Sequence, residues 1–190
     1  GRAFFRAAQE SHDVEIVAIN DLGDINNLAY LLKYDSVYGR APFPVDVAGG
    51  VLVVSGKEVE VFSEKDPMNL PWKDHHIDVV VESTGVFVTY EKASVHLTAG
   101  ARRVVITAPT KGEPTPHHAN GNGEIHGATV LVGVNEDQLK TCQVSSNASC
   151  TTNAVSPLVA ILDEALGIER ALLNTVHAYT ASQALVDSPS

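Results

Sequence analysis

Hydrophobic residues along this chain gather in short runs, separated by polar and glycine-rich stretches, and each run predicts one element. Runs rich in β-branched residues predict strands at 14–19, 77–81, 102–106, 129–132 and 144–145. Two further runs, 51–54 and 58–62, are joined by Ser55 and Gly56 and predict a β-hairpin with a tight turn.

Helices are predicted where apolar residues recur at helical spacing, over 1–8, 25–33 and 90–99. A longer helix is predicted to begin at about Cys150 and to stop at Gly167. Its apolar positions are spaced as a helix spaces a buried face: Ala154, Val155, Leu158, Val159, Leu162 and Leu166. The alternation of strands and helices predicts an α/β fold built on a doubly wound parallel sheet of the Rossmann type.

Composition narrows the classes of protein to which the chain can belong. It has 190 residues and 44% hydrophobic residues, which is enough to build a core. The formal charge of −10 argues against a nucleic-acid-binding surface. No apolar run approaches the roughly 18 residues of a membrane span, and no secretory signal stands at the start.

The two cysteines, Cys142 and Cys150, lack metal-ligand spacing and suit a reducing, cytoplasmic compartment. Three histidines, at positions 117, 118 and 126, invite a metal-site interpretation, but they have neither a partner set nor helical spacing. A solvated loop is the better interpretation, and no metal site is predicted.

Cys150 stands at the first turn of its predicted helix, where unpaired backbone N–H groups favour a thiolate. Residues 171–180 predict a strand that carries His177, which could be the base or cation partner that a thiolate nucleophile needs. The alternative is a buried structural cysteine and a strand histidine with satisfied hydrogen bonds.

Two motifs bear on this choice: Ser-Asn-Ala-Ser-Cys-Thr-Thr-Asn at 146–153 and Thr-Val-His-Ala-Tyr-Thr at 175–180. Together they closely resemble the glyceraldehyde-3-phosphate dehydrogenase family. Shorter stretches agree in the family's order, at 20–22, 32–36, 82–85, 99–101 and 133–135. The resemblance therefore covers nearly the whole chain.

The resemblance implies two domains, an NAD-binding domain over 1–149 and the beginning of an α+β catalytic domain over 150–190. Gly1 matches the last glycine of the family's glycine-rich turn, so that turn and the first strand would be missing. Residues 187–190 are loop-like and close no element. We therefore interpret the chain as a fragment that has little activity alone.

The resemblance also implies a reaction, the NAD-dependent oxidative phosphorylation of D-glyceraldehyde 3-phosphate to 1,3-bisphosphoglycerate in glycolysis. Cys150 would be the nucleophile, forming a thiohemiacetal and then a thioester, and His177 the base. Ser149 and Thr151 would bind inorganic phosphate, and Thr180 and Ser182 the substrate phosphate. A cytoplasmic homotetramer is expected for the full-length protein.

An acidic residue that ends the second strand of a Rossmann unit typically binds the adenosine ribose hydroxyls and repels the extra phosphate of NADP. Asp21 has this position, although it could instead cap the helix that begins near Asp24. With the resemblance, Asp21 is the ribose ligand and NAD the preferred cofactor, to which Pro189 also points. The other cofactor contacts that the resemblance implies are Gly1, Asn20, Lys65, Ser83, Thr84, Gly85, Thr107 and Ala108.

The segment 112–128 departs from the family, because it is longer and rich in turn-forming residues. Two alternatives to the assignment stay open. An erythrose-4-phosphate dehydrogenase would share the cysteine motif, although its histidine segment usually differs from this one. A non-catalytic dinucleotide-binding module would need neither Cys150 nor His177, so the presence of both argues against it.

Overall fold

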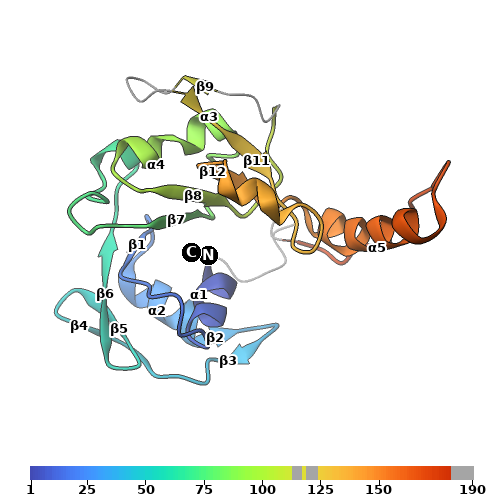
Figure 1. Cartoon of the computed structure of the whole chain (residues 1–190). Helices are drawn as coiled ribbons and strands as arrows, with labels where there is room; N and C mark the ends of the chain where they lie inside the picture. The colour runs from blue at the N-terminus through green and yellow to red at the C-terminus, as the bar shows by residue number, and fades with distance from the viewer. Residues whose placement is uncertain (113–116, 119–123, 181–190) are drawn as a thin grey trace. The chain divides into compact units, whose positions relative to one another are not determined.

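The computed structural model of the chain describes residues 1–112, 117–118 and 124–180 (Figure 1). The described residues form two compact units, one over 1–66 together with 177–180 and the other over 67–176. Among them, no helix combines the length and the apolar character that crossing a membrane requires.

The first unit holds a four-stranded sheet of order β1-β6-β5-β4. Strands β4 (Val45–Ala48), β5 (Val51–Val54) and β6 (Lys57–Phe62) form an antiparallel meander, and β1 (Ala18–Asn20) runs parallel to β6. Helices α1 (Arg2–Ala8) and α2 (Ile25–Lys33) and the small hairpin of β2 (Tyr34–Asp35) and β3 (Gly39–Arg40) complete it. The predicted hairpin and the helix over 25–33 are confirmed, whereas β4 was not predicted.

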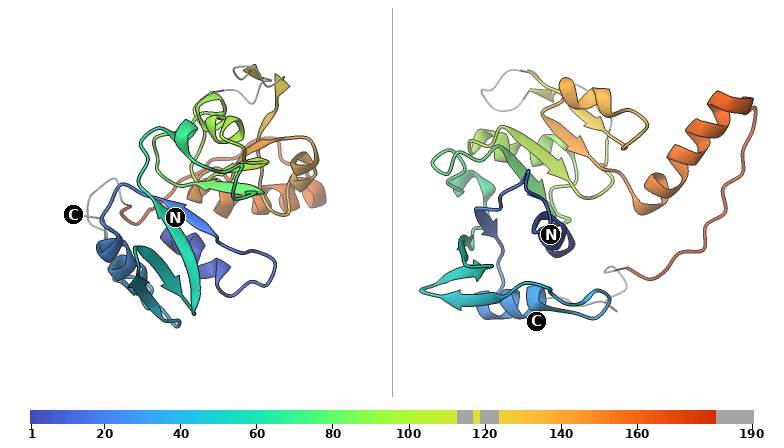
Figure 2. Two further views of the ribbon diagram at one scale, coloured as in Figure 1. Left: turned by 90° about the vertical axis from the view of Figure 1, so that its left-hand side faces the viewer. Right: turned by 60° about the horizontal axis from the view of Figure 1, so that its bottom comes forward.

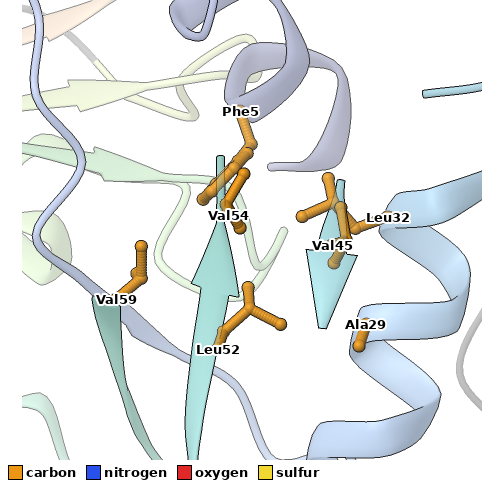
Figure 3. Packing of buried hydrophobic residues seen from close by; sticks show 7 residues of the cluster. All are labelled: Phe5, Ala29, Leu32, Val45, Leu52, Val54 and Val59. Atoms are coloured by element: carbon orange, nitrogen blue, oxygen red, sulfur yellow. The ribbon is translucent and has the colours of Figure 1, made fainter. Parts of the chain in front are cut away.

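The hairpin turn and the core of the first unit follow from the local pattern. Ser55 and Gly56 both have positive φ, 52° and 81°, as a two-residue hairpin turn requires. Alternate residues of β5 point into the core, where they meet side chains from α1 and α2 (Figure 3). Phe5 is buried there, whereas the neighbouring Phe4 is 40% exposed.

The second unit contains a fully parallel four-stranded sheet of order β11-β12-β8-β7, which confirms the predicted α/β class. Its strands are β7 (Val79–Glu82), β8 (Arg103–Ile106), β11 (Gly127–Thr129) and β12 (Val144–Ser146). The helices are η1 (Pro67–Asn69), α3 (Tyr90–Ala93), α4 (Val95–Thr98), η2 (Glu136–Lys140) and α5 (Cys150–Leu166). A short antiparallel pair, β9 (His117–His118) and β10 (Glu124–Ile125), lies between β8 and β11 in the chain.

Tyr90 is the centre of the second unit's core, with only 1% of its surface exposed. Its hydroxyl lies 2.9 Å from the Thr129 hydroxyl, and its ring lies directly against Gly127. A Cβ on Gly127 would stand 2.5 Å from ring atoms of Tyr90, so the close approach of α3 to β11 depends on glycine at this position.

Several predicted boundaries were wrong in detail. The helix expected over 90–99 is interrupted at Ser94, whose hydroxyl donates to the Glu91 carbonyl and competes with the helical pattern. The strands predicted over 14–19 and 129–132 are displaced: β1 shares only Ala18 and Ile19 with the first prediction, and β11 shares only Thr129 with the second, because a strand forms only where a neighbouring strand pairs with it. The first and last residues of an apolar run in the sequence therefore do not mark the ends of the hydrogen-bonded strand.

Helix α5 has the predicted start and stop, and Gly167 ends it with a positive φ of 73°. The expected buried face was wrong for the described structure, because no residue of α5 is buried and Leu166 is 82% exposed. Figure 2 shows α5 followed by an extended trace. Residues 171–180, predicted as a strand, have no regular structure, since no strand pairing joins them to the other described residues.

Candidate active site

The carboxyl ends of three parallel strands meet at one edge of the second unit's sheet. The register pairs Glu82 of β7 with Ile106 of β8, and Ile106 with Ser146 of β12. The residues that follow these strand ends are therefore neighbours, which is where open α/β sheets bind ligands. The predicted site residues follow these three strand ends: Ser83, Thr84 and Gly85 after β7, Thr107 and Ala108 after β8, and Ser149, Cys150 and Thr151 after β12.

A buried hydroxyl connects the cysteine segment to the end of β8. Ser146, with 0% of its surface exposed, donates to the Ala108 carbonyl at 2.7 Å and accepts from the Ala148 N–H at 3.1 Å. Ala148 has a φ of 60°, a left-handed conformation that costs a non-glycine residue about 1–2 kcal/mol. This reversal of the chain, held by Ser146, directs residues 149–150 into the first turn of α5.

Cys150 is the first residue of α5, as predicted, and its side chain is exposed. Ser149 is the N-cap, and its hydroxyl accepts from the Thr152 N–H at 3.0 Å. The Asn153 amide donates to the carbonyls of Asn147 and Ser149, at 2.6 and 2.9 Å, and so holds the turn against the helix. The thiol therefore lies at the positive end of a 17-residue helix.

Cys142 differs from Cys150 in exposure, the property that decides which thiol a substrate can reach. It lies just before the amino end of β12 and is 4% exposed. Burial raises the pKa of the Cys142 thiol, although the nearby Arg103 charge acts in the opposite direction. Of the two thiols, Cys150 is the one that a substrate can reach.

The turn over residues 83–85, which we call the 83–85 turn, follows β7. The Thr84 N–H donates to Glu82 Oε1 at 2.7 Å, the Thr84 hydroxyl donates to the same oxygen, and Gly85 has a φ of 74°. The Ser83 hydroxyl oxygen is buried and has no hydrogen-bond partner among the described residues. A buried hydroxyl without a partner fits a turn that completes its hydrogen bonds with a bound polar group.

Behind this turn lies a buried polar network that the sequence did not predict. Glu82 Oε2 lies 3.0 Å from His96 Nε2, and the Trp72 indole N–H donates to His96 Nδ1 at 3.1 Å. Burial by itself raises the pKa of Glu82, but the hydrogen bonds from His96 and Thr84 outweigh it and hold that pKa below its usual range. The only signal of this network in the sequence was a charged residue, Glu82, at the end of an apolar strand.

In the first unit, the parallel ends of β1 and β6 place Asn20 and Asp21 beside the loop that carries Lys65. The Asn20 amide donates to the Glu64 carbonyl and accepts from the Glu64 N–H, both at 2.9 Å. The Asn20 side chain therefore fixes the backbone at Glu64, just before Lys65. The part that Asn20, Asp21 and Lys65 play in cofactor binding stays a prediction.

Asp21 is not a helix cap, so that alternative is wrong. The cap of α2 is Asp24, whose side chain accepts from the N–H groups of Asn26 and Asn27 at 2.9 and 3.1 Å. Asp21 Oδ1 accepts from the Gly23 N–H at 2.8 Å and lies in the turn after β1. This is the position from which a carboxylate can reach a ribose.

The remaining predicted site residues lie near the ends of the described chain. Gly1 precedes α1, and its carbonyl accepts from the Phe5 N–H at 2.9 Å. His177 and Thr180 are exposed in the irregular segment after α5. Ser182, Pro189 and most of the 112–128 segment lie outside the described residues. The described residues contain no cluster of three or more potential metal ligands.

Comparison with known proteins gives matches along the chain. Residues 1–90 match the model of the glyceraldehyde 3-phosphate dehydrogenase NAD binding domain, and residues 149–190 match that of its C-terminal domain. The first of these matches supports NAD as the cofactor, in agreement with the prediction.

Individual relatives agree along the whole chain. It is 49% identical over 190 residues to the cytosolic glyceraldehyde-3-phosphate dehydrogenase of Trypanosoma brucei brucei. It is 49% identical over 192 residues to the enzyme of that name from Thermotoga maritima, and 48% identical over 191 residues to that of Geobacillus stearothermophilus. These alignments cover 100% of this chain and 53–54% of the relatives, so the chain spans about half the length of the curated relatives it matches.

Proposed function

Because this chain belongs to the glyceraldehyde-3-phosphate dehydrogenase family, we propose that it forms part of an enzyme that oxidises D-glyceraldehyde 3-phosphate to 1,3-bisphosphoglycerate with NAD and inorganic phosphate, a step of glycolysis. The observation that carries this proposal is the common edge of the second unit's sheet, where β12 leads to an exposed thiol at a helix N-terminus and β7, on the other side of β8, leads to the 83–85 turn. A thiol and a cofactor turn on the same sheet edge suit covalent aldehyde oxidation.

NAD, when bound, supplies the acceptor for the hydride. Asp21 would hold the adenosine ribose, with Gly1, Asn20 and Lys65 contributing on the same part of the cofactor. The 83–85 turn, Thr107 and Ala108 would hold the rest. The buried Ser83 hydroxyl, which meets no hydrogen-bond partner in the described part of the chain, supports this assignment.

The chemistry would pass through Cys150. Attack of its thiolate on the aldehyde carbon forms a C–S bond, and the resulting alkoxide takes up a proton to give a thiohemiacetal. The Cys150 backbone N–H would help to stabilise the negative oxygen. His177 would accept the hydroxyl proton while a hydride leaves the carbon, which becomes a thioester carbonyl.

Inorganic phosphate then attacks the thioester carbon, breaks the C–S bond and returns the thiolate. Ser149 and Thr151 would hold this phosphate at the N-terminus of α5, where N–H groups and hydroxyls favour anions. Thr180 and Ser182 would hold the phosphate of the substrate. We further propose that the domain boundary lies just before Cys150, which the C-terminal family match over 149–190 supports.

For the intact protein we propose a cytoplasmic homotetramer, as the resemblance implies, and one relative is itself named cytosolic. Size-exclusion chromatography with light scattering on the intact protein measures the assembly state directly.

The proposed reaction is tested by the initial rate of NAD reduction by the intact protein with glyceraldehyde 3-phosphate, with and without phosphate. A phosphate-dependent rate with NAD, and a much lower rate with NADP, is expected. Oxidation of erythrose 4-phosphate instead would favour the related dehydrogenase. Binding of NAD without any aldehyde oxidation would favour a non-catalytic module.

Asp21→Asn should weaken the preference for NAD over NADP. The neutral amide loses a charged hydrogen bond to the ribose and no longer repels the extra phosphate of NADP, so we expect the ratio of kcat/KM values to fall by about 10- to 100-fold. Asp24→Asn is the matched control, because asparagine caps a helix as well as aspartate does. Equal effects of the two substitutions would contradict the role of Asp21.

A further inference from the structure

The carboxylate of Glu82 is buried and accepts hydrogen bonds on both of its oxygens. Oε1 receives the Thr84 N–H and the Thr84 hydroxyl, and Oε2 faces His96 Nε2. The side chains of His96 and Glu82 are only 5% and 4% exposed. A buried carboxylate is costly unless donors surround it, so the position of Thr84 is tied to the position of this charge.

Trp72 fixes the proton on His96. An indole N–H can only donate, so His96 Nδ1 must be the acceptor in the 3.1 Å bond with Trp72. The neutral ring then carries its proton on Nε2 and donates it to Glu82. The chain of donors runs in one direction, from Trp72 through His96 to the carboxylate.

The contacts of Glu82, Thr84 and His96 hold both ends of the segment that contains the 83–85 turn. The Thr84 hydroxyl also accepts from the Val86 N–H at 3.1 Å, and the Phe87 ring packs edge-on against the His96 ring with centroids 6.1 Å apart. At the other end, the Glu82 carbonyl accepts from the Thr107 N–H at 2.9 Å, which links the turn to the end of β8. Strand β8 thus holds this short turn through the Glu82 backbone carbonyl, and helix α4 holds it through the Glu82 carboxylate.

We propose that Glu82 is a positioning residue for cofactor binding, held in place by His96 and Trp72, and that it presets the 83–85 turn before NAD arrives. The proposal rests on the proposed function, because it assigns that turn to the cofactor. Preorganisation matters here because a turn already in its bound shape loses little conformational freedom when the ligand binds.

Glutamine is a poor replacement for Glu82, because the hydrogen bonds of this network all run from donors toward the carboxylate. Each of the three groups that face the carboxylate donates, so the amide NH₂ of Glu82→Gln must meet a donor. His96 could accept from that NH₂ only by moving its proton to Nδ1, where it would face the Trp72 N–H. Removing the indole N–H by Trp72→Phe relieves that conflict.

The experiment measures NAD binding to the intact protein by isothermal titration calorimetry and the thermal midpoint with and without NAD. Glu82→Gln should raise the Kd for NAD by about 10-fold or more, because the turn would leave its bound shape to relieve the mispaired amide and would have to recover that shape when NAD binds, and it should reduce the NAD-induced rise in Tm. Trp72→Phe alone should have a smaller effect on Kd. The double variant Glu82→Gln with Trp72→Phe should bind NAD more tightly than Glu82→Gln alone.

Val144→Ala is the matched control. It removes buried volume from the same unit at the amino end of β12, away from the 83–85 turn, so it should lower Tm and leave the Kd for NAD unchanged. The proposal is wrong if Glu82→Gln binds NAD with the Kd of the parent. It is also wrong if the double variant binds NAD more weakly than Glu82→Gln alone. Failure of the parent itself to bind NAD would instead overturn the proposed function.

Discussion

Replacing Cys150 by alanine in the intact protein is expected to abolish phosphate-dependent NAD reduction, with kcat falling by about 10⁴-fold or more. The thioester route needs a thiolate at the N-terminus of α5, and alanine offers no atom that can form the bond. The measurement is the initial rate of NADH formation at saturating substrate. NAD binding measured in parallel should be unchanged, which separates loss of chemistry from loss of fold.

Cys142→Ala is the control for this substitution. Cys142 is buried before the amino end of β12, away from the sheet edge that carries Cys150, so its loss should leave kcat within about twofold of the parent. Alkylation with iodoacetamide should modify Cys150 first, because it is exposed. Normal turnover by Cys150→Ala would overturn the proposed mechanism.

Replacing His177 by asparagine is expected to lower kcat by about 10²- to 10⁴-fold, the usual contribution of a general base. Asparagine keeps a polar side chain of similar reach but cannot accept the proton released with the hydride. Single-turnover measurement of NADH formation isolates this step from product release.

His12→Asn is the matched substitution, since His12 is also exposed and lies outside every proposed site. It should leave the single-turnover rate unchanged. A rate for His177→Asn equal to that of His12→Asn would remove His177 from the mechanism and require another base.

Local pattern predicted the elements whose signals lie within a few residues. The hairpin turn at Ser55 and Gly56 requires positive φ, and the start of α5 follows from a serine N-cap before an apolar helix. The helix over 25–33 was also found from its local pattern, because its apolar residues recur at helical spacing. In these cases the physical cause is local, so a single sequence is sufficient.

Predictions from the sequence failed where the structure of a segment depends on another segment that pairs with it or packs against it. Residues 171–180 have strand composition, yet a strand forms only when another strand pairs with it, and the described residues supply none. The apolar face of α5 likewise stays exposed, since no described element covers it. The break at Ser94 in the helix over 90–99 has a different, local cause: the Ser94 hydroxyl donates to the Glu91 carbonyl, a contact that hydrophobic periodicity does not reveal.

The amino-acid sequence by itself determined the family and the place of Cys150, the proposed nucleophile, at a helix N-terminus, because these depend on residue identities that stand next to one another. Only the tertiary structure decided that Asp21 is not a cap, that Ser146 ties the cysteine turn to β8, and that Glu82 meets Trp72 through His96. His96 lies 14 residues from Glu82 and 24 from Trp72. Contacts at such separations form because parallel strands and their helices bring distant residues to one place, which no local pattern encodes.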